Sequence, residues 1–202
     1  MKFNFFDNHI KLDELFRYDK KSNSYIVDIS VDDYRSLYSE LDFSPVKSKD
    51  LDDKLVEYLE ESIEDIPMKY NLIIDIHMPN GIFDSKREEK GKEEIKHYFE
   101  YLKRKKEREI HSYYRAAMMN FVLGVFFIFI VSLIKKNLST TLVIWEIVLE
   151  GFYVGGWVFL WEFFSLIFLE PHKEKERVKQ YKRVLNSKIR YSYCKEKNKD
   201  NS

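Results

Sequence analysis

The sequence has a single cysteine, Cys194, so the chain cannot form an intramolecular disulfide, as is usual in reducing compartments. It also lacks a His-Glu-x-x-His pair, a Gly-rich phosphate loop and a Gly-x-Ser-x-Gly elbow. Each of these motifs would place metal, nucleotide or nucleophile chemistry on one local segment. We therefore predict no catalytic residue and no cofactor, and we expect a protein that is not an enzyme.

The chain also has no net charge, because its 34 basic and 34 acidic residues cancel. The two kinds of charge are nevertheless concentrated in different segments: the net charge is −9 over residues 1–102, +4 over 103–115 and +7 over 171–202. Binding to nucleic acid needs an extended basic face, which an acidic domain does not offer. We expect no nucleic acid among the partners, and we expect the basic stretches to meet the anionic headgroups of a lipid bilayer.

Charge is also missing from residues 116–134, a run of nineteen residues. A helix needs about 20 apolar residues to cross the hydrocarbon core of a bilayer. A second, longer apolar run spans 142–169, and the segment 135–141 joins the two. This pattern predicts a transmembrane hairpin of two antiparallel helices with a short external loop.

The flanking charges predict the orientation of this hairpin. Lys and Arg are concentrated before the first span and after the second, whereas the loop has only Lys135 and Lys136. Because cytoplasmic segments carry the excess of Lys and Arg, we expect both termini in the cytoplasm and the chain in the inner membrane of a cell. The first 20 residues lack a signal-peptide core, so the hairpin itself is expected to direct insertion.

The residues before the hairpin predict a small α+β domain, because alternating and helical patterns follow one another. Ser30 or Asp32 is the expected cap of its first helix, and Pro67 is expected to stop the second. The expected elements are strands at 15–18 and 25–31, helices at 32–41 and 50–65, and a strand at 70–78. A helical pattern returns at about Ser85, and residues 92–134 are expected to form one long helix, or two nearly collinear ones, that leads into the first span.

The predicted organisation is thus a β-β-α-α-β-α domain, a two-helix transmembrane hairpin and a basic C-terminal helix. In the tail, Val178, Tyr181, Val184 and Leu185 outline an amphipathic helix, after which we expect a disordered end. The expected segments are a cytoplasmic domain (1–102), a basic juxtamembrane helix (103–115), transmembrane helices (116–134 and 142–169), a loop (135–141) and a basic cytoplasmic tail (170–202).

Several segments resemble a family of uncharacterised small bacterial and archaeal two-span membrane proteins. They are Val27-Asp28-Ile29-Ser30, Asp42-Phe43-Ser44-Pro45, Lys49-Asp50-Leu51-Asp52, Ile76-His77-Met78-Pro79, Ile95-Lys96-His97-Tyr98-Phe99 and Gly156-Trp157-Val158-Phe159-Leu160-Trp161-Glu162. The family's Trp-Trp-Pro stretch at the membrane exit is replaced here by Glu170-Pro171-His172. The resemblance implies the architecture of a cytoplasmic α+β domain and a membrane hairpin, and it implies no activity.

Glu162 is the most informative residue of the second span. A charged side chain deep in the bilayer costs about 2.5–3.5 kcal/mol on insertion scales, so it needs a partner, water or a proton. Antiparallel pairing puts Asn120 about one helical turn away. Three interpretations stay open: a Glu162–Asn120 hydrogen bond within one chain, a pair between chains, or an ion- or proton-related role.

Two other acidic residues, Glu146 and Glu150, lie one turn apart near the loop. We interpret them as interfacial residues that form salt bridges with Lys135 and Lys136.

Small residues predict close helix packing. Gly151 and Gly155 form a small-xxx-small pair with Gly156 beside it, and Gly124 belongs to a matching small face of the first span. Such faces either pack the hairpin internally or build a homo-oligomer.

Two histidines are weak candidates for a metal site. His77 shares the polar face of its strand with Asp75, and His97 lies near Glu93 on a helix. Their spacing does not require a metal, and solvated or core-edge histidines are the simpler interpretation. We expect no metal.

The basic collar, Lys103, Arg104, Lys105 and Lys106, is expected to face lipid headgroups and to fix the topology. The leading hypothesis is a membrane-anchored docking or sensor protein. Its cytoplasmic domain would be coupled to the hairpin and bind a cytoplasmic protein or a second copy. The alternatives are an oligomeric channel with Glu162 in the membrane pathway and a membrane-tethered enzyme built on His77 and His97.

Overall fold

The structure is a computed structural model that describes residues 12–39, 51–137 and 143–194. The chain divides into two compact units, one of residues 1–103 and 179–202 and one of residues 104–178. We call the first the sheet domain and the second the helical hairpin. The sheet domain includes a C-terminal segment that the sequence patterns had placed in the tail.

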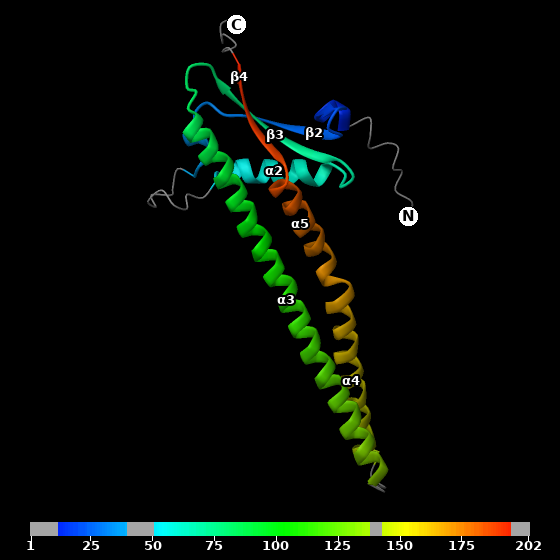
Figure 1. The fold of residues 1–202 in the computed structure, drawn as a ribbon. Coiled ribbons are helices and arrows are strands. Elements are labelled where there is room, and N and C mark those ends of the chain that lie inside the picture. The colour runs from blue at the N-terminus through cyan, green and yellow to red at the C-terminus, as the bar shows by residue number, and fades with distance from the viewer. Residues whose placement is uncertain (1–11, 40–50, 138–142, 195–202) are drawn as a thin grey trace, which may run out of the picture. The chain divides into compact units, whose positions relative to one another are not determined.

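The elements follow the predicted mixed α+β class, which is confirmed. A helical turn at 12–15 precedes the named elements. In chain order these are β1 (Arg17–Asp19), β2 (Ser24–Ser30), η1 (Tyr34–Leu37), α2 (Asp53–Asp65), β3 (Asn71–Pro79), α3 (Ser85–Asn137), α4 (Val143–Phe168), α5 (Glu170–Leu185) and β4 (Lys188–Cys194) (Figure 1).

The sheet has four strands in the order β1-β2-β3-β4. β1 pairs with β2 in antiparallel orientation, and both the β2–β3 and β3–β4 pairs are parallel. The predicted β-hairpin is therefore present. β2 is more buried than its alternation indicated, because Ile26, which points away from the main core, is only 7% exposed. Ile26 is paired in register with Arg17 of β1 and with Ile73 of β3, whose side chains flank it on the same face of the sheet.

The prediction of a disordered end is wrong for residues 188–194, which form β4. β4 pairs with β3 over seven residues, from Ile73↔Lys188 to Pro79↔Cys194. Its sequence, Lys-Ile-Arg-Tyr-Ser-Tyr-Cys, alternates polar and apolar side chains as a half-buried strand does. The predicted disorder of residues 195–202 and the predicted loop centre, 138–142, lie outside the described residues.

Asp side chains cap several elements of the sheet domain. Asp52 accepts hydrogen bonds from the backbone of Lys54 and Leu55 and begins α2. The predicted helix at 32–41 is only the four-residue η1, and its cap is Asp33 rather than Ser30 or Asp32. η1 stops at Leu37, where the backbone turns to bridge Tyr38 with Leu51.

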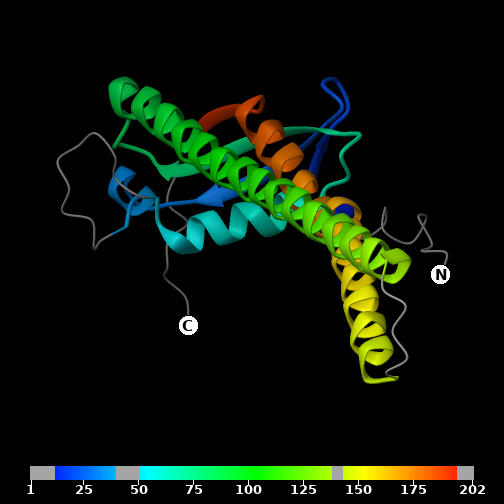
Figure 2. The same cartoon turned by 90° about the horizontal axis from the view of Figure 1, so that it is seen from below.

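The main core lies between the sheet and α2, the first part of α3 and the last part of α5. Figure 2, viewed from the helix side, shows these helices crossing the sheet. Central side chains of the core are at most 2% exposed: Val27, Leu59, Ile63, Ile74, Ile76, Ile95, Phe99 and Val184. The amphipathic face predicted for the tail therefore packs on a protein core through Tyr181 and Val184.

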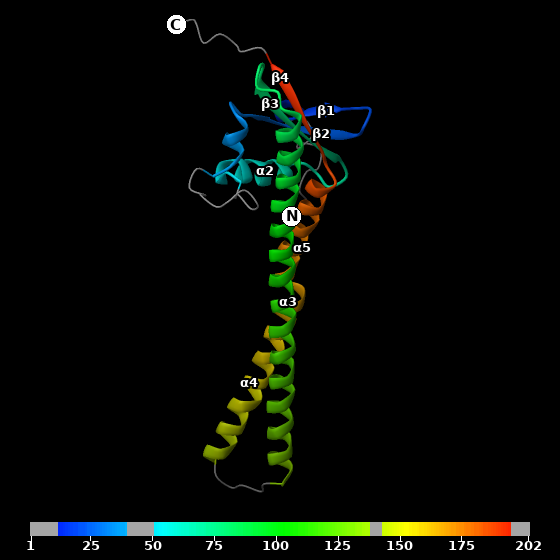
Figure 3. The ribbon, with the colours of Figure 1, turned by 60° about the vertical axis from the view of Figure 1, so that its left-hand side comes forward.

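The helical hairpin consists of the rest of α3, all of α4 and the first part of α5, and α4 diverges from α3 toward the loop (Figure 3). α4 and α5 meet at Leu169, and Pro171 lies in the first turn of α5. Proline is tolerated there because the first backbone N–H groups of a helix have no intrahelical acceptor. Pro171 thus begins the predicted C-terminal helix.

Candidate functional site

A cluster of charged side chains lies on the sheet face opposite α2, α3 and α5. Successive side chains of a strand point to opposite faces, so the residues beside Ile74 and Ile76 point away from the core. Register aligns Asp28 of β2, Asp75 of β3 and Arg190 of β4 in one row, and Ser30, His77 and Ser192 in the next. We call the set Arg17, Asp28, Asp75, His77, Arg190 and Ser192 the polar face.

Asp75 is the centre of the polar face. Its side chain is 2% exposed, so the charge needs partners. Arg190 donates to Oδ2 at 2.6 Å, Ser192 donates to Oδ1 at 2.6 Å, and Arg17 donates to Oδ2 at 3.1 Å. Three strands therefore hold one carboxylate: β3 supplies it, and β1 and β4 supply its cations.

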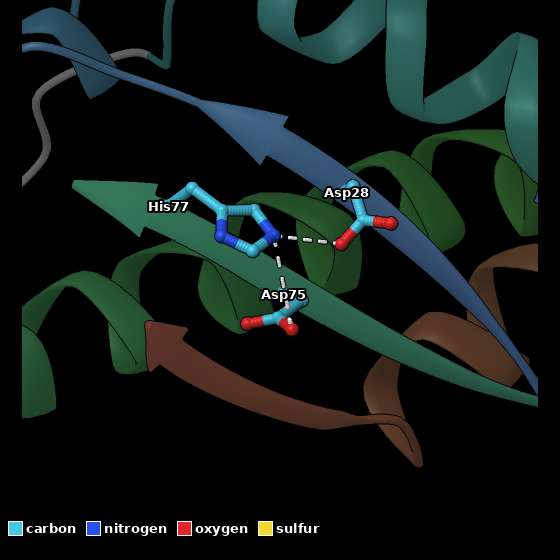
Figure 4. A group of neighbouring side chains, drawn as sticks. All are labelled: Asp28, Asp75 and His77. Atoms are coloured by element: carbon cyan, nitrogen blue, oxygen red, sulfur yellow. Dashed lines mark hydrogen bonds and ion pairs between the residues drawn. The ribbon is translucent and has the colours of Figure 1, made fainter. Parts of the chain in front are cut away.

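Asp28 and His77 complete the cluster (Figure 4). Arg17 donates to both oxygens of Asp28, through Nε at 2.7 Å and through Nη2. The Nε2 atom of His77 lies 2.7 Å from Asp28 Oδ1 and 3.8 Å from Asp75 Oδ2. The three side chains drawn in Figure 4 thus come from two neighbouring parallel strands.

The cations keep both carboxylates ionised. Burial alone would raise the pKa of Asp28, but hydrogen bonds from Arg17 and His77 lower it below its ordinary value. Burial likewise opposes ionisation of Asp75, and hydrogen bonds from Arg190 and Ser192 lower its pKa. The hydrogen bond to Asp28 raises the pKa of Arg17.

The same geometry decides between a metal site and an ion-pair network. Asp28, Asp75 and His77 have ligand atoms within 4.8 Å of one another, which is close enough for one metal ion. However, two guanidinium groups already bind the carboxylate oxygens and balance their charge. A divalent cation would meet two positive neighbours, so these residues fit an ion-pair network better than a metal site.

The polar face presents its positive groups outward. The side chain of Arg17 is 56% exposed and that of Arg190 is 38% exposed, whereas Asp75 is hidden beneath them. Lys188, on the same face of β4, is exposed as well. Arrangements of this kind attract carboxylates or phosphates, because Arg donates planar pairs of hydrogen bonds.

The other predicted metal candidates are placed elsewhere. His97 and Glu93 are exposed on α3, whose Ile95 and Phe99 pack on the opposite side of the sheet. The structure does not bring them to His77 and Asp75. The third residue of the cluster with His77 and Asp75 is instead Asp28 of β2.

Glu162 and Asn120 are not joined in the structure. The Asn120 amide donates to the backbone carbonyl of Ala116 on its own helix, at 3.1 Å. Glu162 is exposed on α4 and has no hydrogen bond or ion pair with another residue of the described part of the chain. One N–H of the amide is therefore satisfied by a carbonyl one turn back on its own helix rather than by α4.

Near the loop, the Lys135 ammonium lies 2.6 Å from Glu150 and over the ring of Tyr153. This pair joins α3 to α4 as predicted for Glu150. Glu146 is exposed and forms no ion pair with Lys135 or any other described residue.

The four glycines of the hairpin divide into two pairs. A Cβ on Gly124 would lie 2.9 Å from the Gly156 carbonyl oxygen, and one on Gly156 would lie 2.7 Å from Ile128. These two glycines therefore allow α3 and α4 to approach closely. A Cβ on Gly151 or Gly155 would have no atom of the described residues within 4 Å, so these two glycines do not pack the hairpin.

The basic collar is only partly available to lipid. Lys103 binds Glu100, and Lys106 binds Glu109 and Glu174. Lys105 and Arg108 are exposed on α3, and Lys173 and Arg177 are exposed on α5. The exposed cations therefore come from two helices, whereas the predicted collar used α3 alone.

Four residues of the polar face were not predicted: Arg17, Asp28, Arg190 and Ser192. The alternation of β4 was visible in the sequence, but its polarity and basic charge favoured a solvated tail. Only pairing with β3 brings residues more than 110 positions apart into contact.

We compared the chain with protein-family models, with curated proteins and with solved structures, and nothing matched in any of the three.

Proposed function

We propose that this chain is a two-span membrane protein without catalytic activity, whose sheet domain docks an acidic segment of a cytoplasmic protein on the polar face. The hairpin anchors the domain in the inner membrane, and both chain ends lie in the cytoplasm. Two kinds of exposed surface support this proposal: apolar side chains on the hairpin and cations on the sheet.

The exposed apolar surface of the hairpin is the observation that best supports the proposed membrane anchor. Two helices are long and apolar enough to cross a membrane. Only 17% of the apolar window of α3 and 6% of that of α4 is buried. The core helix of a soluble protein would be mostly buried, and a signal sequence would lie near the N-terminus. A lipid environment is the solvent in which such surfaces are stable.

The charges at the ends of the hairpin support the orientation. Lys105, Arg108, Lys173 and Arg177 are exposed where α3 enters and α5 leaves the apolar region. Anionic headgroups of the cytoplasmic leaflet attract such cations by about 1 kcal/mol each. The same excess of Lys and Arg favours a cytoplasmic location for both ends.

Membrane integration is tested by alkaline carbonate extraction of native membranes, in which we expect the protein to stay in the pellet. Cys194, the single cysteine, reports the orientation. A membrane-impermeant maleimide should label it only after the membrane is opened. Extraction into the soluble fraction would refute the anchor, and labelling of intact cells would refute the orientation.

The docking partner follows from charge. Arg17, Arg190 and Lys188 are exposed on the polar face, and the two carboxylates are engaged by arginines. An acidic peptide is therefore the complementary ligand. A ten-residue poly-glutamate peptide serves as the probe, with the full chain in nanodiscs.

We expect Lys188→Glu to weaken poly-glutamate binding at least fivefold and to reduce its dependence on salt. Lys54→Glu, an exposed site at the start of α2, is the matched control and should leave binding unchanged. Equal loss in both variants would indicate non-specific attraction and would remove the polar face as the docking site.

A channel is the second candidate, because Glu162 is exposed on α4. In an oligomer such a carboxylate would line a water-filled path. Glu162→Gln should then change ion flux through reconstituted bilayers while insertion is kept. The absence of flux in the wild type would eliminate this candidate.

A further inference from the structure

The two edges of the sheet differ. At one edge β1 pairs with only three residues of β2, and beyond β1 the Tyr58 hydroxyl donates to the backbone carbonyl of Asp28 at 3.2 Å. At the other edge β4 pairs with β3 over seven residues and is the last strand of the sheet (Figure 4). We call the side of β4 turned away from β3 its outer edge. No residue in the described part of the chain forms a hydrogen bond with the backbone of this outer edge.

The outer edge of β4 is suited to pairing with another strand. The N–H and C=O groups of an edge strand can pair with a further extended segment, and proteins commonly prevent this with a proline, a bulge or a very short strand. β4 contains no proline, and its register with β3 runs without interruption from Ile73↔Lys188 to Pro79↔Cys194. Charged side chains are the one common form of protection that β4 does have.

The charge of β4 indicates which segment can pair with it. The strand has two basic residues, Lys188 and Arg190, and no acidic residue. Lys188 is exposed, and Arg190 uses only its Nη2 atom, which donates to Asp75 at 2.6 Å, for hydrogen bonds with described residues. Neighbouring strands attract each other through opposite charges and repel through like charges. A second copy of β4 would add two cations, so the edge favours an acidic segment.

The helix side of β4 offers a different surface. Ile189 is buried there, and Tyr191 and Tyr193 pack against the core. The ring of Phe83, which is 68% exposed, lies edge-on to that of Tyr193 with 5.7 Å between the ring centroids. Side chains that a docked segment directs to this side would therefore meet an exposed aromatic ring near the end of β4, and apolar side chains fit this surface.

We propose that β4 binds the acidic segment as a fifth strand of the sheet. The backbone of the segment pairs with the outer edge, its acidic side chains lie beside Lys188 and Arg190, and the side chains between them face the side of Phe83. The inference rests on the proposed docking function and adds the binding mode and the ligand class. Because side chains of a strand alternate between the two faces, the ligand is a segment in which acidic and apolar residues alternate.

Methylation of peptide nitrogens tests the backbone pairing. The probe is a capped seven-residue peptide of alternating Glu and Val, and its affinity for the full chain in nanodiscs is measured. Two further peptides carry N-methyl groups, one on the three Val amides and the other on the last three Glu amides. Successive amides of a strand point to opposite edges, so only one set faces β4. We expect one methylated peptide to bind at least about tenfold more weakly than the probe, because it loses several hydrogen bonds, and the other to bind within about twofold of it.

Hydrogen exchange identifies the strand that the probe contacts. Binding of the unmethylated peptide should slow the exchange of the outward amides of residues 188–194 and leave the amides of β2 unchanged. Protection in β2 without protection in 188–194 would refute pairing with β4. Outward amides that are already protected in a dimeric free protein would also refute the proposal, because a second copy would then occupy the edge.

Equal affinity of the two methylated peptides would overturn the binding mode, whether both match the probe or both are weaker. The acidic segment would then contact the polar face without backbone pairing, and binding of poly-glutamate by the wild type would leave the proposed docking function intact. Failure of that function is a separate result, in which the wild type binds neither poly-glutamate nor the alternating peptide, and it removes both proposals.

Discussion

The sheet domain and the helical hairpin bury side chains by opposite rules. In the domain, apolar residues of α2, α3 and α5 are hidden against the sheet, and one carboxylate, Asp75, is buried among cations. In the hairpin, most apolar residues are exposed, and the contact between helices rests on two glycines and a line of aromatic rings. The domain thus hides its apolar surface inside its own core, whereas the hairpin leaves apolar surface exposed, which the proposed membrane anchor would place in lipid.

The largest expected difference between the sheet domain and the hairpin comes from replacing, one at a time, two phenylalanines of α3. Phe99 of α3 is fully buried and Phe129 of α3 is 58% exposed. We expect Phe99→Ala to destabilise the sheet domain by about 3–5 kcal/mol, because it removes buried area and leaves a cavity. Phe129→Ala should leave domain stability unchanged. Denaturant titration followed by hydrogen exchange in β3 measures the domain stability of both variants. Equal loss of stability would contradict the claim that only the sheet domain depends on buried apolar side chains.

The next largest effect is expected for the buried carboxylate. Asp75→Asn leaves Arg190 and Arg17 with a neutral partner in a buried place, at a cost of about 2 kcal/mol. Asp28→Asn should cost about 1 kcal/mol or less, since the Asp28 side chain is 35% exposed and water replaces part of the loss. The same exchange experiment compares the two variants. A larger loss at Asp28 would show that Asp75 is not the centre of the network.

Acid should weaken the domain before the hairpin. The pKa values of Asp28 and Asp75 are lowered in the folded protein, so their stabilisation is present above the unfolded pKa of about 3.9. It is lost as the pH falls through the folded values. Thermal unfolding at pH 6, 4 and 3 should show a falling midpoint for the domain. The Asp28→Asn, Asp75→Asn double variant should show a flatter dependence, and an unchanged slope would refute the assignment.

The smallest expected effect concerns the ion pair near the loop. Lys135 and Glu150 have side chains 43% and 62% exposed, so Lys135→Ala should change hairpin stability by about 0.2–1 kcal/mol. All three tryptophans, Trp145, Trp157 and Trp161, lie in α4, so their fluorescence reports hairpin unfolding in micelles. Added salt should abolish the difference between variant and wild type. A difference that persists in salt would indicate a desolvated pair.

The sequence predicted correctly the elements that are determined by nearby residues, such as turn residues, helix caps and apolar spacing. The β-hairpin turn follows from Asp19, which accepts hydrogen bonds from Lys21 and Ser22, and from Asn23, whose φ is 49°. α2 follows from its apolar spacing and the Asp52 cap. The long α3 was expected because the helical pattern returns at about Ser85 and no breaker occurs between residues 92 and 134, and α3 does begin at Ser85, where Asp84 caps it.

The sequence predicted only part of the candidate site. His77 and Asp75 were expected on one polar strand face, because they are two residues apart. Arg17 and Arg190 could not be assigned to the same site, since nothing local indicates that β1 and β4 flank β2 and β3. Whether His97, the other weak metal candidate, lies near His77 could not be predicted for the same reason, because the direction in which α3 crosses the sheet is a tertiary property.

The sequence by itself determined where charge and apolar surface lie, because hydrophobic length, charge segregation and capping residues act within a few turns of chain. Only the tertiary structure decided that the C-terminal segment returns to the sheet and that its Arg190 neutralises Asp75. Strand order and parallel register depend on contacts between distant residues, whose free energy is shared by the whole core. No single segment carries that information.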